Sequence, residues 1–165
     1  MLIGSSQAFE KLVKEYQAPI RRLFLNLTLG DEMLSEDLAQ DTFLKAFNGW
    51  NSFRHLSGTR TWLFRIAYNV FYDYRRSLHI TEDIDSLETS HPHYETDPNL
   101  RADIYKAMQK LSDIEKICVT LSLVEDQPIK TVVRVTGLNE NTVKSHIRRG
   151  REKMANFLKA NDYGR

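Results

Sequence analysis

The chain has 165 residues, of which 41% are hydrophobic and 27% are charged, a balance typical of a globular protein with one or two small domains. It contains no run of about 18 apolar residues, and its first residues lack the basic-then-apolar pattern of a secretion signal, so we expect a cytoplasmic protein. The single Cys118 excludes a disulfide framework. Because it lies in the apolar run ICVTLSLV, we predict a buried, unreactive thiol. The net charge of +1 does not by itself indicate a polyanionic partner.

The first half of the chain has the spacing of three helices. Apolar residues follow a three-four period from Phe9 to Leu27, with Pro19 as a kink or break and Gly30 as a stop. A second helix is predicted from Glu32 to Trp50, and a third from about Thr59 through the stretch RTWLFRIAYNVFYDYRRS. Strand-like alternation is rare here, so a helical bundle is expected.

The third predicted helix is rich in aromatic residues. Six of the seventeen residues from Arg60 to Arg76 are aromatic. A projection at about 100° per residue places one set of side chains opposite the apolar stripe: Arg65, Asn69, Tyr72 and Arg76. Flat rings stack on unpaired bases and guanidinium groups contact phosphates, which is typical of proteins that bind single strands. The alternative is that the rings only fill the core.

Charge divides the chain into three parts. Residues 1–80 carry ten Lys or Arg against eight Asp or Glu, residues 81–112 carry three against seven, and residues 113–165 carry ten against seven. The acidic middle has two prolines and no sustained apolar period, so we predict a flexible linker at 79–96 between domains at 1–78 and 97–165. Its histidines, His79, His91 and His93, lack the spacing of metal ligands, and no metal site is predicted.

The last part of the chain has the plan of a helix-turn-helix. Pro128 can open a short helix whose inner face carries Val132 and Val135, Gly137 supplies the turn, and Asn139 caps the following helix. Such a scaffold presents its second helix outward, at the position where recognition helices enter the major groove of DNA.

This second helix is strongly basic on one side. Residues 142–154, TVKSHIRRGREKM, include five Lys or Arg. Its apolar stripe consists of Val143, Ile147, Met154 and Leu158. The opposite side presents Ser145, flanked by Lys144, Arg148 and Arg149. A solvated surface is the simplest interpretation of a charge run, but the preceding scaffold favours contact with guanine edges and phosphates.

Three stretches together resemble the extracytoplasmic-function group of bacterial RNA polymerase sigma factors. SEDLAQDTFLKAF is similar to the family's polymerase-binding helix, RTWLFRIAYNVFYDYRR to its promoter-melting and minus-ten helix, and TGLNENTVKSHIRRGREKM to its minus-thirty-five helix-turn-helix. Their order and separation match the family as well. The resemblance implies an all-α protein of two small helical domains, namely a promoter-melting bundle and a helix-turn-helix domain, joined by a flexible acidic linker.

The resemblance also assigns candidate site residues. It implies that the polymerase clamp is bound by Asp37, Gln40, Asp41 and Phe43. It implies that the minus-ten element and single-stranded DNA are bound by Arg60, Trp62, Arg65, Asn69, Tyr72 and Arg76. Within that set, Asn69 and the loop NSFRHLSGT match the pocket for a flipped-out base, which must offset the cost of unstacking. It implies that the minus-thirty-five element is bound by Thr142, Lys144, Ser145, Arg148 and Arg149.

Two departures from the family's pattern limit what is carried over. The scaffold helix QPIKTVVRV replaces the usual Ser-aromatic-acidic start and has Val133 where a small residue is common. Arg148 stands where relatives often carry other residues. The promoter sequence therefore cannot be copied from a relative.

These observations predict an alternative sigma factor that binds core RNA polymerase and promoter DNA and promotes strand opening. Signatures of a catalytic nucleophile, carboxylate pair, metal site or phosphate loop are absent from the sequence, so we expect neither an enzyme nor a cofactor nor a small-molecule substrate. The resemblance implies an anti-sigma partner, commonly membrane-anchored. The alternatives are a dimeric helix-turn-helix regulator, which leaves the aromatic helix unexplained, and a sigma-like adaptor that titrates an anti-sigma factor, which would normally carry a receiver domain. A small nuclease is the least favoured.

Overall fold

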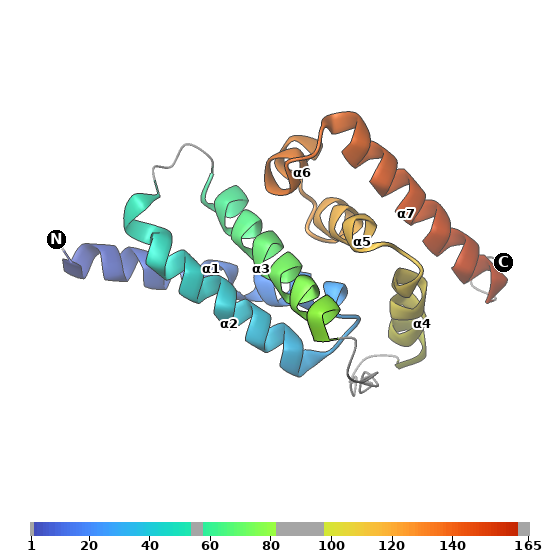
Figure 1. Ribbon diagram of the computed structural model, residues 1–165, viewed down its shortest axis with the longest axis horizontal. Helices are drawn as coiled ribbons and strands as arrows, with labels where there is room; N and C mark the ends of the chain where they lie inside the picture. The colour runs from blue at the N-terminus through green and yellow to red at the C-terminus, as the bar shows by residue number, and fades with distance from the viewer. Residues whose placement is uncertain (1, 54–57, 82–97, 162–165) are drawn as a thin grey trace.

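The computed structural model describes residues 2–53, 58–81 and 98–161, and throughout these ranges its regular structure is helical (Figure 1). The first group of helices is α1 (Leu2–Leu27), α2 (Glu32–Gly49) and α3 (Thr59–Thr81), with a short 3-10 turn, η1 (Trp50–Ser52), after α2. The second group is α4 (Pro98–Gln109), α5 (Asp113–Val119), the π-helical turn η2 (Thr120–Val124), α6 (Ile129–Thr136) and α7 (Glu140–Ala160). The expected all-α fold is confirmed. Most of the predicted linker lies outside the described residues.

The junction between α1 and α2 is fixed by local hydrogen bonds. Helix α1 passes through Pro19 without ending, so the sequence-based alternative of a break there is wrong. The predicted stop at Gly30 is confirmed, because this residue has φ of 90° and its N–H donates to the carbonyl of Leu25 at 2.7 Å. Asp31 then caps α2 by accepting from the N–H of Leu34 at 3.0 Å.

The helix-turn-helix predicted from the sequence is present. Gly137 ends α6 in the left-handed conformation, with φ of 74°, and its N–H donates to the carbonyl of Val133 at 2.8 Å. Asn139 caps α7 by accepting from the N–H of Thr142 at 2.8 Å. Pro128 occupies the position just before the first residue of α6 instead of lying in its first turn. These caps fix where α7 begins and therefore which side chains its first two turns present.

A buried glycine, Gly150, lets α7 pack directly on Val119 of α5 and on Leu111 just before it. A Cβ atom at Gly150 would stand 2.6 Å from Cγ2 of Val119 and 3.2 Å from Cδ2 of Leu111. Both neighbouring side chains are buried and have little room to move. The glycine therefore lies with Val143 and Ile147 on the buried side of α7. A glycine inside a helix often has a packing role, but the sequence alone does not show which neighbour it packs against.

Alanine at Gly150 should destabilise the second domain. The added methyl group overpacks the contact with Val119, so we expect a loss of about 1–3 kcal/mol in the free energy of unfolding, measured by urea denaturation. Gly49→Ala is the matched control, because a Cβ there would meet only Trp62, at an ordinary distance of 3.6 Å. Equal stabilities of the two variants would contradict this account of the packing.

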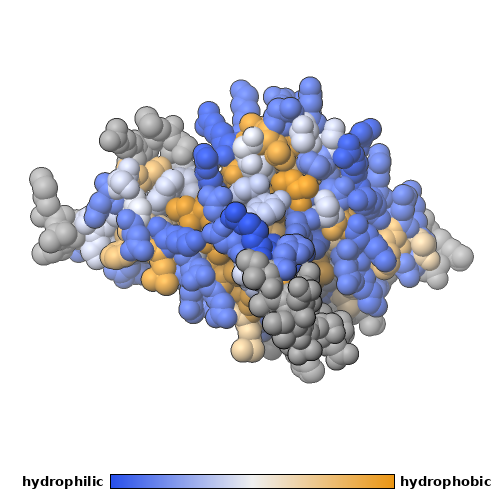
Figure 2. All heavy atoms as spheres, in the orientation of Figure 1, coloured by the Kyte–Doolittle hydropathy of each residue, from blue (hydrophilic) through white to orange (hydrophobic). Residues whose placement is uncertain are grey.

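The two groups of helices share one continuous hydrophobic core. Helix α3 packs against α6, and α1 contacts α5 and η2. Buried side chains of the first group, such as Phe64 and Phe71, and of the second, such as Ile117 and Val132, belong to the same cluster. In Figure 1, α3 accordingly lies between its own bundle and α5 and α6. Figure 2 shows the same face as mainly hydrophilic, with separate apolar patches. The sequence did not indicate this mutual packing.

Candidate polymerase and promoter interfaces

The basic helix α7 presents its cations to solvent. Lys144, Arg148 and Arg149 are exposed, whereas Thr142 and Ser145 are half-buried. Lys144 forms an ion pair with Glu140, one turn earlier, with the Nζ to Oε1 distance at 2.7 Å. Both side chains of that pair are more than half exposed, so it contributes little to stability and is easily exchanged for a phosphate. The first turns of α7 therefore form a basic surface suited to the major groove.

Lys153, also on α7, binds a carboxylate of the protein and is not available to DNA. Lys153 donates from Nζ to both carboxylate oxygens of Glu115, at 2.8 and 3.1 Å, and so ties α7 to α5. Glu115 is buried and also accepts from the backbone N–H of Ser112 within the capping box of α5. Burial disfavours its charged form, but the hydrogen bonds from Lys153 and Ser112 outweigh burial and lower the pKa of Glu115. Lys153 thus has a structural role.

The lowered pKa of Glu115 predicts a pH-dependent contribution to stability. Because the folded carboxyl ionises more readily than the unfolded one, its contribution is present above the ordinary pKa of 4.5 and is lost as pH falls through the folded value. Glu115→Gln should lower the free energy of unfolding by about 1–2 kcal/mol at pH 7. Denaturation of both proteins at several pH values should show the difference shrinking below about pH 4. A difference that stays constant with pH would contradict this role.

On α3, part of the predicted DNA-binding set is exposed along one face. Arg65, Asn69 and Arg76 are exposed and recur at intervals that return to the same side of the helix. Arg76 forms an ion pair with Asp73, which also accepts from Lys45 of α2 at 3.3 Å. These surface pairs leave the guanidinium of Arg76 accessible for a phosphate.

The other members of that set are placed differently. The guanidinium of Arg60 lies over the ring of Tyr16 in α1, 5.8 Å from its centroid, and so points away from the face of Arg65. Tyr72 is half-buried, with its ring centroid 4.7 Å from that of Tyr68. Burial and the nearby Tyr68 and Asp113 raise the pKa of Tyr72. Tyr72 also packs against the hydrophobic core that the two groups of helices share.

Aromatic residues around the start of α3 form a cluster that the sequence did not reveal. Trp62 stacks on Phe53, with centroids 4.4 Å apart and planes at 20°, and Trp50 lies 6.0 Å from Trp62. Phe9 of α1 contacts Trp50 and Phe47 edge-on, at 5.6 and 5.2 Å. These contacts anchor both ends of the loop that the sequence assigns to base capture. Its residues 54–57 lie outside the described ranges.

The exposed face of α2 is larger and more apolar than predicted. Asp37, Gln40 and Asp41 are exposed as expected, while Phe43 is half-buried. Three apolar side chains share the exposed face: Met33, Leu44 and Phe47, with exposed fractions of 82%, 62% and 57%. The sequence does not reveal this apolar face, because apolar residues occur on more than one side of α2 and hide its amphipathic period. Apolar side chains mixed with carboxylates are typical of a protein-docking surface.

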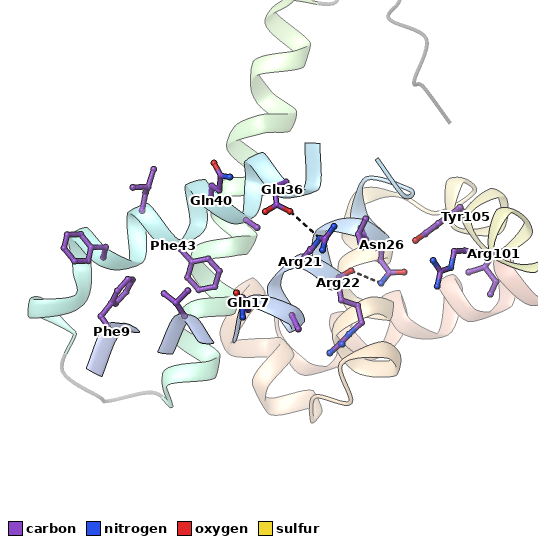
Figure 3. A pocket seen from close by; sticks show the side chains of 17 residues that line it. Phe9, Gln17, Arg21, Arg22, Asn26, Glu36, Gln40, Phe43, Arg101 and Tyr105 are labelled. Carbon is purple, nitrogen blue, oxygen red and sulfur yellow. Dashed lines mark hydrogen bonds and ion pairs between the residues drawn. The ribbon is translucent and has the colours of Figure 1, made fainter. Parts of the chain in front are cut away.

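A groove of about 1100 Å³ runs beside this face and is walled by both groups of helices (Figure 3). Its apolar lining includes Phe9 and Val13 of α1, Phe43 and Leu44 of α2, and Ile104 of α4. Its polar lining includes Gln17, Arg21, Arg22, Glu36, Gln40 and Arg101. Arg21 pairs with Glu36 across the groove at 3.4 Å. An apolar floor with a basic rim fits an amphipathic helix with acidic flanks.

Two further kinds of chemistry-bearing group can be located in the described part of the chain: the single thiol and the possible metal ligands. Cys118 is fully buried, and burial raises the pKa of its thiol to about 12, as the predicted inert thiol requires. Within the described ranges, no three His, Cys, Asp or Glu residues are grouped so that they could hold a metal ion. His91 and His93 lie outside those ranges. No described helix is both long and apolar enough to cross a membrane.

In the residues that the structure describes, the fold is all-helical and consists of a three-helix group followed by a group that ends in a helix-turn-helix with a basic outer face. Two family descriptions match the chain in the corresponding order: Sigma-70 region 2 at residues 12–79 and Sigma-70 region 4 at residues 101–154. The first covers most of α1 and all of α2 with nearly all of α3, and the second covers the helix-turn-helix.

Several characterised sigma factors are similar over most of the chain. The RNA polymerase sigma factor CarQ of Myxococcus xanthus is 30% identical, covering 94% of this chain and 91% of its own length. The RNA polymerase sigma-H factor of Pseudomonas aeruginosa is 28% identical, covering 90% and 85%. The ECF RNA polymerase sigma factor SigE of Mycolicibacterium smegmatis is 29% identical and covers 92% of this chain, which in turn spans only 62% of that relative.

Two solved structures are similar to this chain in fold. The sigma factor RpoE from Bartonella quintana, crystallised with the anti-sigma factor NepR, is 26% identical, with a TM-score of 0.82 over 96% of this chain and 99% of its own. CnrH, in complex with the cytosolic domain of CnrY, has the same fold, with a TM-score of 0.72 at 24% identity over 95% and 91% of the two chains. This chain belongs to the ECF group of sigma-70 RNA polymerase sigma factors, as its residues suggested.

Proposed function

We propose that this chain joins core RNA polymerase as an alternative sigma factor, directs it to a promoter and opens the DNA strands there. The observation that carries the proposal is the presence, in one chain and in order, of both sigma-70 regions, each with an exposed candidate surface. The polymerase supplies the chemistry, so the chain itself is not an enzyme. Its place of action is then the cytoplasm, where polymerase and chromosome meet.

The first domain carries the proposed surfaces for the polymerase and the minus-ten element, and the second carries the proposed surface for the minus-thirty-five element. The face of α2 that carries Asp37, Gln40, Asp41 and Leu44 docks on the polymerase. The face of α3 with Arg65, Asn69 and Arg76, together with the Trp62 cluster, holds the unpaired strand of the minus-ten element by stacking and phosphate contacts. Helix α7 enters the major groove at the minus-thirty-five element through Lys144, Ser145, Arg148 and Arg149.

We further propose that an anti-sigma factor inserts a helix into the groove between α1, α2 and α4. RpoE, the similar sigma factor from Bartonella quintana, was crystallised with an anti-sigma factor. In this chain Gln40 and Phe43 line the groove and also belong to the predicted polymerase surface. Occupation of the groove would therefore exclude the polymerase from α2. The groove is lined by α1 and α2 of the first domain and by α4 of the second, so the bound helix of the anti-sigma factor would contact both domains.

Run-off transcription tests the function directly. Purified chain added to core polymerase from its host should produce discrete transcripts from genomic templates, and the mapped start sites should share two upstream elements. A helix-turn-helix regulator would instead need a second sigma factor and would bind spaced half-sites as a dimer. An adaptor that only titrates an anti-sigma factor would bind that partner but give no transcripts. Absence of transcripts together with absence of core binding would overturn the proposal.

A further inference from the structure

The first turn of α7 presents an asparagine, Asn141, whose side-chain amide has no hydrogen-bond partner among the described residues. Asn139, two positions earlier, is different, because its side-chain oxygen caps the helix by accepting from the N–H of Thr142 at 2.8 Å. Asn26 and Asn161 donate to backbone carbonyls one turn earlier in the chain. Asn141 is exposed, so both the donor and the acceptor of its amide are available to a ligand.

Helical spacing places Asn141 at the head of a row that faces away from the core. Ser145 and Arg148 follow it by four and seven positions and therefore lie on the same side of α7. The buried residues of this helix lie on the opposite side: Val143, Ile147 and Gly150. Thr142 is half-buried and points about a quarter turn away from the row. Asn141, and not Thr142, is thus the first residue of the outward row.

A hollow beside this row indicates which side of α7 meets the DNA backbone. It has a volume of about 420 Å³ and lies between Ile129, at the start of α6, and the middle of α7. The charged residues that line it are three cations and one acid: Lys144, Arg148, Arg151 and Glu152. In helix-turn-helix proteins the first helix crosses the DNA backbone, while N-terminal residues of the second contact base edges. Phosphates therefore fit the hollow, and the adjacent row that Asn141 begins faces the bases.

The charged neighbour of Asn141 already has a partner. Glu140 accepts from Nζ of Lys144 at 2.7 Å, and this contact, with a smaller contribution from the charge of Lys130, lowers the pKa of Glu140. The amide of Asn141 is therefore the available neutral hydrogen-bonding group at the start of α7. Among the base edges in the major groove, adenine presents an acceptor, N7, beside a donor, the N6 amino group. A planar amide matches this pair with its own donor and acceptor.

We propose that Asn141 is a specificity-determining residue for the minus-thirty-five element, where its amide recognises one adenine in the major groove. The amide N–H donates to N7 of the base, and the amide oxygen accepts from the N6 amino group. This inference rests on the proposed role of α7 and adds to it one residue and one base. The minus-thirty-five element then contains an adenine whose selection depends on this side chain.

The test uses the full chain in holoenzyme with core polymerase from its host, as wild type, Asn141→Ala and Asn156→Ala. Asn156 is an exposed asparagine near the other end of α7, so its replacement is the same chemical change on the same helix. Each holoenzyme selects from promoter DNA in which the minus-thirty-five element is randomised. Wild type and Asn156→Ala should prefer adenine at one position by between about fivefold and about 150-fold. Asn141→Ala should lose this preference and keep those at the other positions.

An altered base then identifies the contact. At the selected adenine, 7-deazaadenine lacks the N7 acceptor and should weaken wild-type binding about twofold to tenfold, while leaving the affinity of Asn141→Ala unchanged. Three results would each overturn the inference: a wild-type element without a required adenine, an Asn141→Ala variant with unchanged preferences, or no effect of 7-deazaadenine on the wild type. A wild-type holoenzyme that selects no element at all would contradict the proposed role of α7 itself. Circular dichroism melting checks that both variants are folded.

Discussion

Alanine at both Arg148 and Arg149 should abolish most of the preference of the holoenzyme for its upstream promoter element. Both side chains are exposed on the third turn of α7, whose start is fixed by the Asn139 cap. Loss of an arginine that contacts a base should cost about 1–3 kcal/mol and relax the sequence preference at one position. Loss of a phosphate contact should weaken binding to all sequences alike and lower the salt slope by about one.

These two contributions can be separated by measurement. The holoenzyme carrying each single variant and the double variant would be titrated with promoter DNA and with single-base variants of the upstream element, at several salt concentrations. Lys159→Ala is the matched control, since it removes an exposed cation near the far end of the same helix. Unchanged affinity and unchanged preference in the double variant would show that the basic side of α7 is only a solvated surface.

Local signals predicted the second domain well because short-range chemistry determines its helix ends. The positive φ at Gly137 and the Asn139 cap depend on residues within one turn, and the buried Val132 and Val135 follow from helical spacing. Gly150 escaped notice because its importance lies in Val119, thirty-one positions earlier in the chain and against it in space. A close approach between two helices leaves no signature in the spacing of either one.

Helix α3 shows the same limit more clearly. Its aromatic content left two interpretations open, core or base stacking, and the structure divides the residues between them. Phe64 and Phe71 are core, whereas Trp62, Tyr68 and Tyr72 are half-buried. The face assigned to Tyr72 was correct as a helical projection. A helical projection of α3 alone cannot show that the second domain packs against one side of this helix. Partners such as Arg22 and Glu125, separated by 103 positions, are likewise invisible to local patterns.

On α2, the exposed apolar residues change what a docking experiment should target. Asp41 was predicted from the resemblance, but Leu44 lies one turn further on and is 62% exposed, with no role in the core. An apolar side chain at the centre of an interface is expected to matter more than a rim charge, since it is fully desolvated on binding. Phe47 is a less direct target because its ring also packs on Phe9.

We therefore expect Leu44→Asp to weaken core polymerase binding strongly, by about 2–4 kcal/mol if the side chain is buried in the complex. Asp41→Lys should also weaken it, but by less, because reversing a charge at the rim of an interface mainly slows association and changes its salt dependence. Arg65→Ala is the contrasting variant: it should leave core affinity unchanged but reduce open-complex formation on duplex and premelted templates alike, because its contact is to the unpaired strand. Titration of labelled core separates these effects, and unfolding measurements exclude loss of structure. If Leu44→Asp and Asp41→Lys both bound core as tightly as the wild type, the exposed face of α2 would not be the docking surface, and the polymerase would have to bind elsewhere on the first domain.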